Sequence, residues 1–158
     1  RCMIRLLGDM RSYNYVITPI HDFDKVIYKI RSIDFDQQSF EGNLKVYRPQ
    51  FFKENLKMVE LVKDCLSKSS VDQYKIEERA IVARRILSNE SRLTHLLKCM
   101  LNDHISTKEN VLKLRNEIFK LTSYSMFKKS NSMGEILKAS FNFIKRNYEN
   151  HQMLSIRN

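Results

Sequence analysis

Two motifs near the start of the chain, Gly8-Asp9-Met10-Arg11-Ser12-Tyr13-Asn14 and Ile33-Asp34-Phe35-Asp36, decide which fold the sequence predicts. In the first motif an acid is followed two positions later by a cation and five positions later by an amide. In the second motif an apolar run leads directly into two acids. Carboxylate and amide oxygens are ligands for the magnesium ion that accompanies the phosphates of a nucleotide. The spacing therefore indicates a site for phosphoryl transfer.

The segment between the two motifs has the residue types of a β-hairpin. Residues 13–18 are aromatic and β-branched, and residues 25–33 alternate for part of their length, with Val26, Tyr28 and Ile30 on one face. The run Pro19-Ile20-His21-Asp22 is expected to break the first strand. A connection of about six residues then predicts a hairpin with a longer loop. Residues 37–43 read as a polar loop.

From Pro49 onward the pattern is helical. Pro49 suits a first helical position, and apolar residues then recur at helical spacing. Three capping boxes are expected to open helices: Ser70 with Gln73, Ser106 with Glu109, and Ser132 with Glu135. The predicted fold is α+β and mostly helical, with a short hairpin followed by about five amphipathic helices. We expect a single domain over residues 1–158, made of a loop-and-hairpin segment (1–43), a helical bundle (44–150) and a frayed tail (151–158).

The composition is that of a soluble globular protein. Apolar residues make up 42% of the chain and charged residues 29%. No run reaches the ~18 apolar residues that a membrane span needs. Three widely spaced cysteines, Cys2, Cys65 and Cys99, make a poor disulfide framework, so we expect reduced thiols and a cytoplasmic location.

The two motifs resemble those of the protein-kinase-like superfamily, over residues 6–42. The order of catalytic loop, hairpin, metal-binding Asp, loop and helices is that of a kinase C-terminal lobe. The resemblance implies that Asp9 is the catalytic base and that Arg11 is the cation facing the transferred phosphoryl group. It further implies that Asn14 and Asp34 bind the cofactor, ATP with Mg²⁺, and that Asp36 is a further metal ligand. Gly8-Asp9 and the Asp-Phe-Asp form are similar to the aminoglycoside and choline kinase branch.

The sequence departs from the family pattern in several places. Leu7 stands near a position where a His is usual, and Asp36 replaces the usual Gly. No Gly-rich phosphate loop, strand Lys or partner Glu precedes Asp9. The chain starts at Arg1 without a signal peptide, so we expect its start to be a cut boundary. The resemblance then implies a missing N-terminal lobe, an inactive isolated chain, and a phosphate acceptor that the sequence does not specify.

The charge distribution leaves two alternatives open. The first 43 residues carry equal numbers of basic and acidic side chains, so the net charge of +10 belongs entirely to the rest of the chain. One alternative is a basic helical module that engages nucleic acid or an acidic protein partner, with nucleic acid less favoured because the charge is diffuse. It would use Lys53, Lys57, Arg84, Arg85, Lys128, Lys129, Lys145 and Arg146. The other is a pseudokinase scaffold, which keeps the fold for interaction alone.

One further set of side chains has the spacing of metal ligands. His95 and Cys99 are one helical turn apart, and His104 follows. His95 and Cys99 lie beside the apolar stripe of residues 93–101, so we expect packing or surface roles rather than metal binding.

Overall fold

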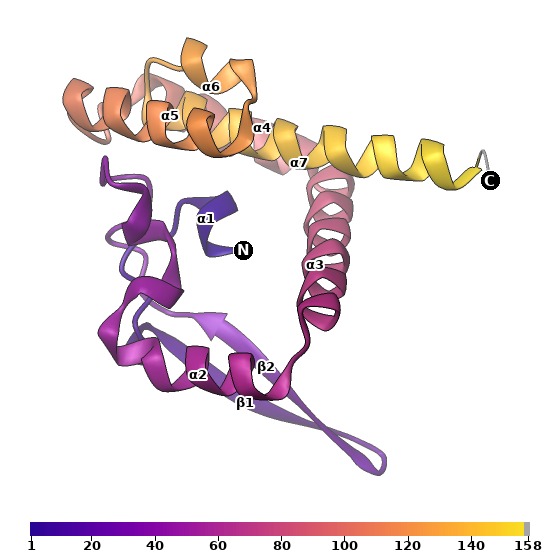
Figure 1. The fold of residues 1–158 in the computed structure, drawn as a ribbon. Coiled ribbons are helices and arrows are strands. Elements are labelled where there is room, and N and C mark those ends of the chain that lie inside the picture. Colours follow the sequence, from indigo (N-terminus) through magenta and orange to yellow (C-terminus); the bar gives the residue numbers. More distant parts are fainter. Residues whose placement is uncertain (157–158) are drawn as a thin grey trace.

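The fold is a two-stranded hairpin joined to a layer of helices. The computed structural model describes residues 1–156, and their side chains as far as residue 149. In chain order the elements are α1 (Cys2–Arg5), β1 (Tyr15–Asp22), β2 (Lys25–Ser32), α2 (Leu56–Cys65), α3 (Lys68–Ser88), α4 (Glu90–Asn102), α5 (Lys108–Thr122), α6 (Ser125–Lys129) and α7 (Met133–Ile156). Figure 1 shows the hairpin and α2 at one end, α4 to α7 at the other, and α3 connecting the two. The predicted α+β, mostly helical class is confirmed, with seven helices among the described residues.

The core lies among α4, α5, α6 and α7. Its buried apolar side chains include Leu97, Leu114, Phe127 and Ile136, one from each of these helices. The rings of Tyr124, Phe127 and Phe143 pack against one another at its edge. Because α7 contacts α1 and α3 as well as the other three helices, it is the element around which the helices pack.

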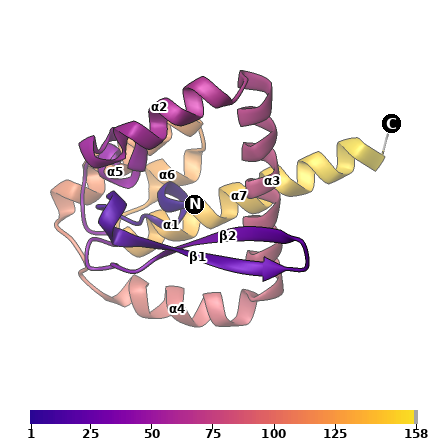
Figure 2. The same cartoon turned by 90° about the horizontal axis from the view of Figure 1, so that it is seen from below.

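The hairpin is longer than the sequence predicts, and its turn is shorter. β1 continues through Pro19 to Asp22, and only Phe23 and Asp24 lie between the strands, so the expected break and six-residue loop are wrong. Each strand of a two-stranded sheet has one edge without a partner strand. A proline whose nitrogen faces this open edge removes no hydrogen bond between the strands, so a strand can continue through Pro19. Figure 2 shows the two strands as a narrow ribbon.

The first helical segment begins later than expected. Residues 49–55 form two short 3₁₀ turns, Pro49–Phe51 and Lys53–Asn55, and α2 starts only at Leu56. Pro49 does occupy the first position of its turn. These turns place the side chains of Phe52, Glu54 and Asn55 beside the first motif.

Two of the three predicted capping boxes are wrong. Ser67, and not Ser70, caps α3 by accepting a hydrogen bond from the backbone N–H of Ser70. Thr107, and not Ser106, caps α5 in the same way. Ser67 and Thr107 carry the same hydroxyl group as the predicted caps Ser70 and Ser106, and they lie only one to three positions away. The local sequence therefore permits a cap at either position.

The third capping box and the end of the chain agree better with the sequence. The backbone N–H of Glu135 donates to the hydroxyl of Ser132 at 3.2 Å, as the capping box predicts, while the carboxylate of Glu135 accepts from the backbone N–H of Asn131 and not from that of Ser132. α7 continues to Ile156, beyond the apolar pattern that ends at Tyr148. Residues 151–156 are therefore helical, while residues 157 and 158 lie outside the described residues, and fraying of this tail stays a prediction. Among the described residues, none of the helices is both long and apolar enough to cross a bilayer.

Candidate functional site

The first motif lies in a loop that is anchored by apolar side chains. Leu6, Leu7 and Met10 are fully buried, and Leu6 belongs to the same apolar core as residues of α4 to α7. Asp9 has a left-handed backbone conformation, with φ at 51°. Such a conformation costs a non-glycine residue roughly 1–3 kcal/mol, and side chains held this way are often functional. The loop therefore fixes Asp9 between two buried neighbours in one defined orientation.

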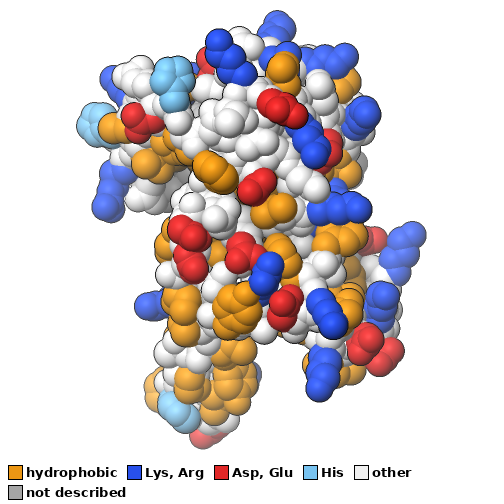
Figure 3. All heavy atoms as spheres, turned by 90° about the vertical axis from the view of Figure 1, so that its left-hand side faces the viewer, with side chains coloured by type: hydrophobic (Ala, Val, Ile, Leu, Met, Phe, Trp, Pro, Cys, Tyr) orange, Lys and Arg blue, Asp and Glu red, His pale blue; other side chains and the backbone are white. Residues whose placement is uncertain are grey.

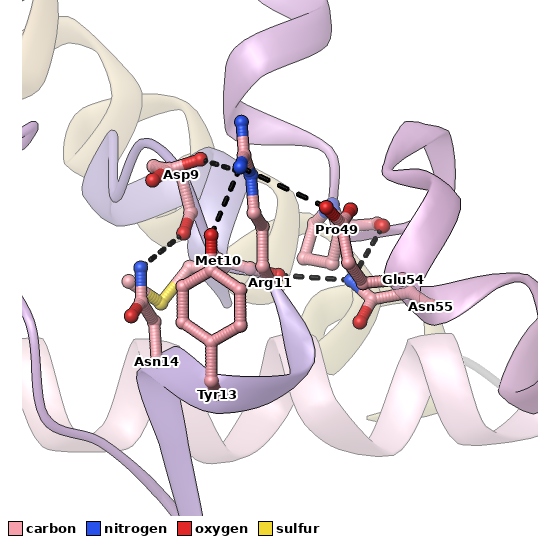
Figure 4. A network of polar contacts seen from close by, with 8 residues as sticks. All are labelled: Asp9, Met10, Arg11, Tyr13, Asn14, Pro49, Glu54 and Asn55. Carbon is pink, nitrogen blue, oxygen red and sulfur yellow. Dashed lines mark hydrogen bonds and ion pairs between the residues drawn. The ribbon is translucent and has the colours of Figure 1, made fainter.

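Asn14 joins the two ends of this motif. Its Nδ2 donates to the backbone oxygen of Asp9 at 2.7 Å, and the backbone N–H of Arg11 donates to the same oxygen at 2.8 Å. Asn14 is only 6% exposed, which fixes the side chain. Figure 4 shows its carboxamide oxygen turned away from the carboxylate of Asp9. With Nδ2 engaged, Oδ1 is the end of the amide that remains for a ligand.

Arg11 lies between two carboxylates. Its Nε is 2.8 Å from Oδ1 of Asp9, and its Nη1 is 3.7 Å from Oε1 of Glu54 (Figure 4). Nη1 also donates to the Tyr13 hydroxyl at 2.9 Å, and the guanidinium lies over the ring of Phe52. The hydrogen bond with Tyr13 raises the pKa of Arg11, and the charge of Asp9 raises it further. These contacts hold the cation at the side of Asp9.

The second motif lies directly against the first. The backbone N–H of Ile33 donates to the backbone oxygen of Asn14 at 3.1 Å, and that of Ser39 donates to Leu6 at 2.9 Å. A Cβ on Gly8 would lie 2.6 Å from the backbone oxygen of Gln37, so only glycine permits this contact between the two loops. The structure therefore brings Asp9, Arg11, Asn14 and the loop of Asp34 into one region.

The two acids of the second motif differ in their surroundings. Asp34 is half-buried, and its Oδ1 accepts a hydrogen bond from the backbone N–H of Asp36 at 3.3 Å. Asp36 is exposed. Asp34 thus folds its own loop into a turn, and Asp36 stands at the outer edge of the site.

The predicted donors, two carboxylates and one amide, are of the oxygen types that magnesium binds. Among the described residues, no group of three or more His, Cys, Asp or Glu side chains is placed to hold a metal. The predicted set differs from such a cage because it has two carboxylates, Asp34 and Asp36, and one amide, Asn14. Magnesium is usually bound by one or two carboxylates together with water and substrate phosphates, rather than by an all-protein cage.

Residues from the 3₁₀ turns complete the site, and the sequence did not point to them. Asn55 is fully buried, and its Nδ2 donates to the backbone oxygens of Met10 at 2.9 Å and Pro49 at 2.8 Å (Figure 4). The hydroxyl of Tyr15 donates to its Oδ1 at 3.2 Å. Asn55 thereby ties the first motif to the helical part and to the base of β1. The only sequence signal for this role is a polar residue, Asn55, in a stretch whose pattern predicts a helix.

The basic residues of the alternative interpretation do not gather in one place. Lys57 lies in α2 and Lys128 in α6, at opposite ends of the molecule in Figure 1. Lys145 pairs with Glu90 at 2.7 Å, and Lys128 lies over the ring of Phe119. Figure 3 shows Lys and Arg side chains interspersed with Asp and Glu on the face that it presents.

The remaining residues with the spacing of metal ligands lie on the surface. His95, Cys99 and His104 are all exposed, the first two on α4 and the third just after it.

A comparison of the chain with protein-family models, curated proteins and solved structures finds no match.

Proposed function

We propose that residues 9–36 form the phosphoryl-transfer site of a kinase-like phosphotransferase that uses ATP and Mg²⁺, and that the chain is its C-terminal lobe. One observation carries the proposal. Asn14 binds the backbone of Asp9 through its side chain and the backbone of Ile33 through its own carbonyl, so a single buried residue joins the two motifs. Phosphoryl transfer depends on positioning and electrostatics more than on covalent chemistry, and a shared buried connector supplies positioning.

Each side chain has a separate role in this proposal. Asp9 accepts the proton of the acceptor hydroxyl and orients it. Arg11 moves from its resting contact with Asp9 toward the anionic phosphoryl group, with which its guanidinium makes charge-assisted hydrogen bonds. Oδ1 of Asn14 and the carboxylate of Asp34 would hold a magnesium ion, which would supply neutralisation of the charge on the phosphates. The exposed Asp36 would support that ion.

A phosphotransferase of this kind also needs a lobe that clamps the nucleotide, and we propose that this lobe packs against the hairpin. The hairpin supports this assignment, because its apolar side chains are exposed on both faces and a lone two-stranded hairpin is at best marginally stable in water. An adjoining lobe that packs on the hairpin would cover these side chains. The phosphate acceptor remains unassigned.

The test is turnover of MgATP by the protein expressed from its complete reading frame, measured as release or transfer of the γ-phosphate. Asp9→Asn is expected to lower turnover by about 10²–10⁴-fold, because it removes a general base. Asp34→Asn is expected to abolish it by removing the main metal ligand. The matched control is Asp24→Asn, since Asp22-Phe23-Asp24 repeats the Asp-Phe-Asp sequence at the hairpin tip, away from the first motif.

Two results would contradict the proposal. If Asp34→Asn and Asp24→Asn turn over MgATP equally well, Asp34 is not the metal ligand. If the wild-type protein binds MgATP without turnover, the pseudokinase alternative replaces the enzyme.

A further inference from the structure

A separate groove lies where α1, the end of α3, the start of α4 and α7 meet. Its volume is about 530 Å³, within the range of small-molecule sites. Apolar side chains from three helices form its floor, and arginines from α1, α3 and α4 stand around it. The apolar floor includes Ile86 and Phe141 together with Leu96, which is 52% exposed, and the rim includes Arg5, Arg85 and Arg92.

The rim arginines lack acidic partners. A fourth arginine, Arg1, is neutralised by an ion pair with Glu78. Among the described residues no carboxylate pairs with Arg85 or Arg92, and the guanidinium of Arg5 faces the ring of Phe35 at 6.0 Å. The groove itself has no acidic residue in its lining. Three cations that share one cavity repel one another, and an anion between them offsets that repulsion.

The start of α4 adds partial positive charge beside the groove, and the acid in its first turn, Glu90, is paired with Lys145. Asn89 precedes the helix, but its Nδ2 donates back to the backbone oxygen of Arg85 at 3.0 Å, and its side chain does not cap α4. The first backbone N–H groups of a helix carry partial positive charge, and here no side chain at the cap position satisfies them. Since Asn89 and Arg92 both line the groove, this helix end lies beside the rim arginines.

We propose that this groove, which we name the arginine groove, binds a small amphiphilic anion, one with a phosphate or carboxylate head and an apolar tail. Guanidinium groups bind such heads through paired hydrogen bonds, and the floor of Ile86, Leu96 and Phe141 receives the tail. A polyanion such as nucleic acid fits less well, because the apolar floor offers its backbone nothing. The proposal stands apart from the phosphoryl-transfer site and does not depend on it.

Isothermal titration calorimetry of the 158-residue chain with octyl phosphate, below the concentration at which it forms micelles, tests the proposal. Octyl phosphate is expected to bind more tightly than inorganic phosphate, which lacks the tail, and than octanol, which lacks the charge. Arg85→Gln and Arg92→Gln are each expected to weaken binding about tenfold, the equivalent of one charge-assisted hydrogen bond. Leu96→Ser is expected to weaken octyl phosphate and leave inorganic phosphate unchanged.

The matched control is Arg84→Gln. Arg84 is the neighbour of Arg85 in α3 and is also exposed, but it does not line the groove, so its loss is expected to leave binding unchanged. Both rim arginines are exposed, so the variants are expected to fold, and circular dichroism checks this. Equal binding by the Arg85→Gln and Arg92→Gln double variant and by wild type would overturn the proposal. So would equal affinities for octyl phosphate and inorganic phosphate, or binding to anionic vesicles without binding to octyl phosphate.

Discussion

The helical layer and the hairpin bury their apolar side chains to very different extents. In the layer of α4 to α7, large side chains such as Leu114, Phe127 and Ile136 are almost completely buried. In the hairpin every residue is exposed except Tyr15 and Ser32, the half-buried pair at its base. Figure 3 shows hydrophobic side chains gathered on the lower projection that the hairpin forms. Its exposed large apolar residues are Val16, Ile17, Ile20, Phe23, Val26, Ile27, Tyr28 and Ile30.

This contrast indicates where a site can be pre-organised. The helical layer is held by its own core, whereas the hairpin is held at its base. There Ile33 bonds to Asn14, and Tyr15 bonds to Asn55. The proposed catalytic and metal-binding residues all flank that base. The rest of the hairpin offers a large apolar surface, of the kind that marks an interaction site.

The largest expected effect is in the helical core. Leu114→Ala, at a fully buried position of α5, should lower the free energy of unfolding by about 2–5 kcal/mol, because it removes apolar contacts and leaves a cavity. Urea denaturation followed by circular dichroism measures this. Leu112→Ala is the control, since Leu112 lies in the same helix and is 46% exposed. Equal losses for the two variants would mean that α5 does not pack as described.

The next effect concerns the junction between the two regions. Asn55→Ala should cost about 1–3 kcal/mol, because the buried backbone oxygens of Met10 and Pro49 lose their donor. The same denaturation experiment measures it, with Asn102→Ala, at an exposed position at the end of α4, as the comparison. A junction that tolerates Asn55→Ala without loss would show that the first motif is held by other means.

A smaller effect appears at alkaline pH. Burial raises the pKa of Tyr47, whose hydroxyl donates to the backbone oxygen of Glu41 at 2.6 Å. The folded state therefore favours the neutral phenol. This stabilisation is complete below the unfolded pKa of about 10 and is lost at about 1 kcal/mol per pH unit as the pH rises toward the folded pKa.

Stability curves between pH 9 and 11 check this prediction. Tyr47→Phe should lose less stability over this range than wild type, while Tyr28→Phe, at an exposed hairpin position, should behave as wild type. A wild-type slope that Tyr47→Phe leaves unchanged would contradict the account.

The smallest effect is expected within the hairpin. Ile17 and Ile30 face each other across the strands and are 57% and 55% exposed. Ile17→Thr with Ile30→Thr should change stability by less than about 0.5 kcal/mol per site, as for other exposed positions. Amide hydrogen exchange should also be faster in β1 and β2 than in α5 and α7. Stability losses that rival those of Leu114→Ala would mean that the hairpin packs against something in the isolated chain.

Local pattern was sufficient to predict some features of the fold. The β-branched run before Pro19 and the apolar stripes of the later helices led to a hairpin and to a mostly helical class, both of which the structure has. The cap at Ser132 was also predicted correctly. Ser70 and Ser106 were chosen wrongly because the true caps, Ser67 and Thr107, offer the same chemistry at a neighbouring position. To predict that β1 continues through Pro19, one would have to know that the sheet has only two strands.

For the site, the sequence was informative about residue identity and not about contacts. Asp9 and Asn14 are close in the chain, so their proximity follows from any tight loop. The contact of Arg11 with Glu54, and that of Asn55 with Met10, join residues more than forty positions apart. Such pairs depend on tertiary packing, for which one sequence has no periodic signal. The exposure of the hairpin is likewise invisible in its alternating pattern.

The most direct test of the proposed site is cation binding at the base of the hairpin. Mn²⁺, used as a paramagnetic substitute for Mg²⁺, is titrated into the ¹⁵N-labelled chain while amide signals are followed by NMR. The account predicts that the signals of Asn14 and Asp34 broaden first, that Asp34→Asn removes this selectivity, and that Asp24→Asn leaves it intact. Broadening that starts at the hairpin tip around Asp22 and Asp24, or that Asp34→Asn leaves unchanged, would contradict it.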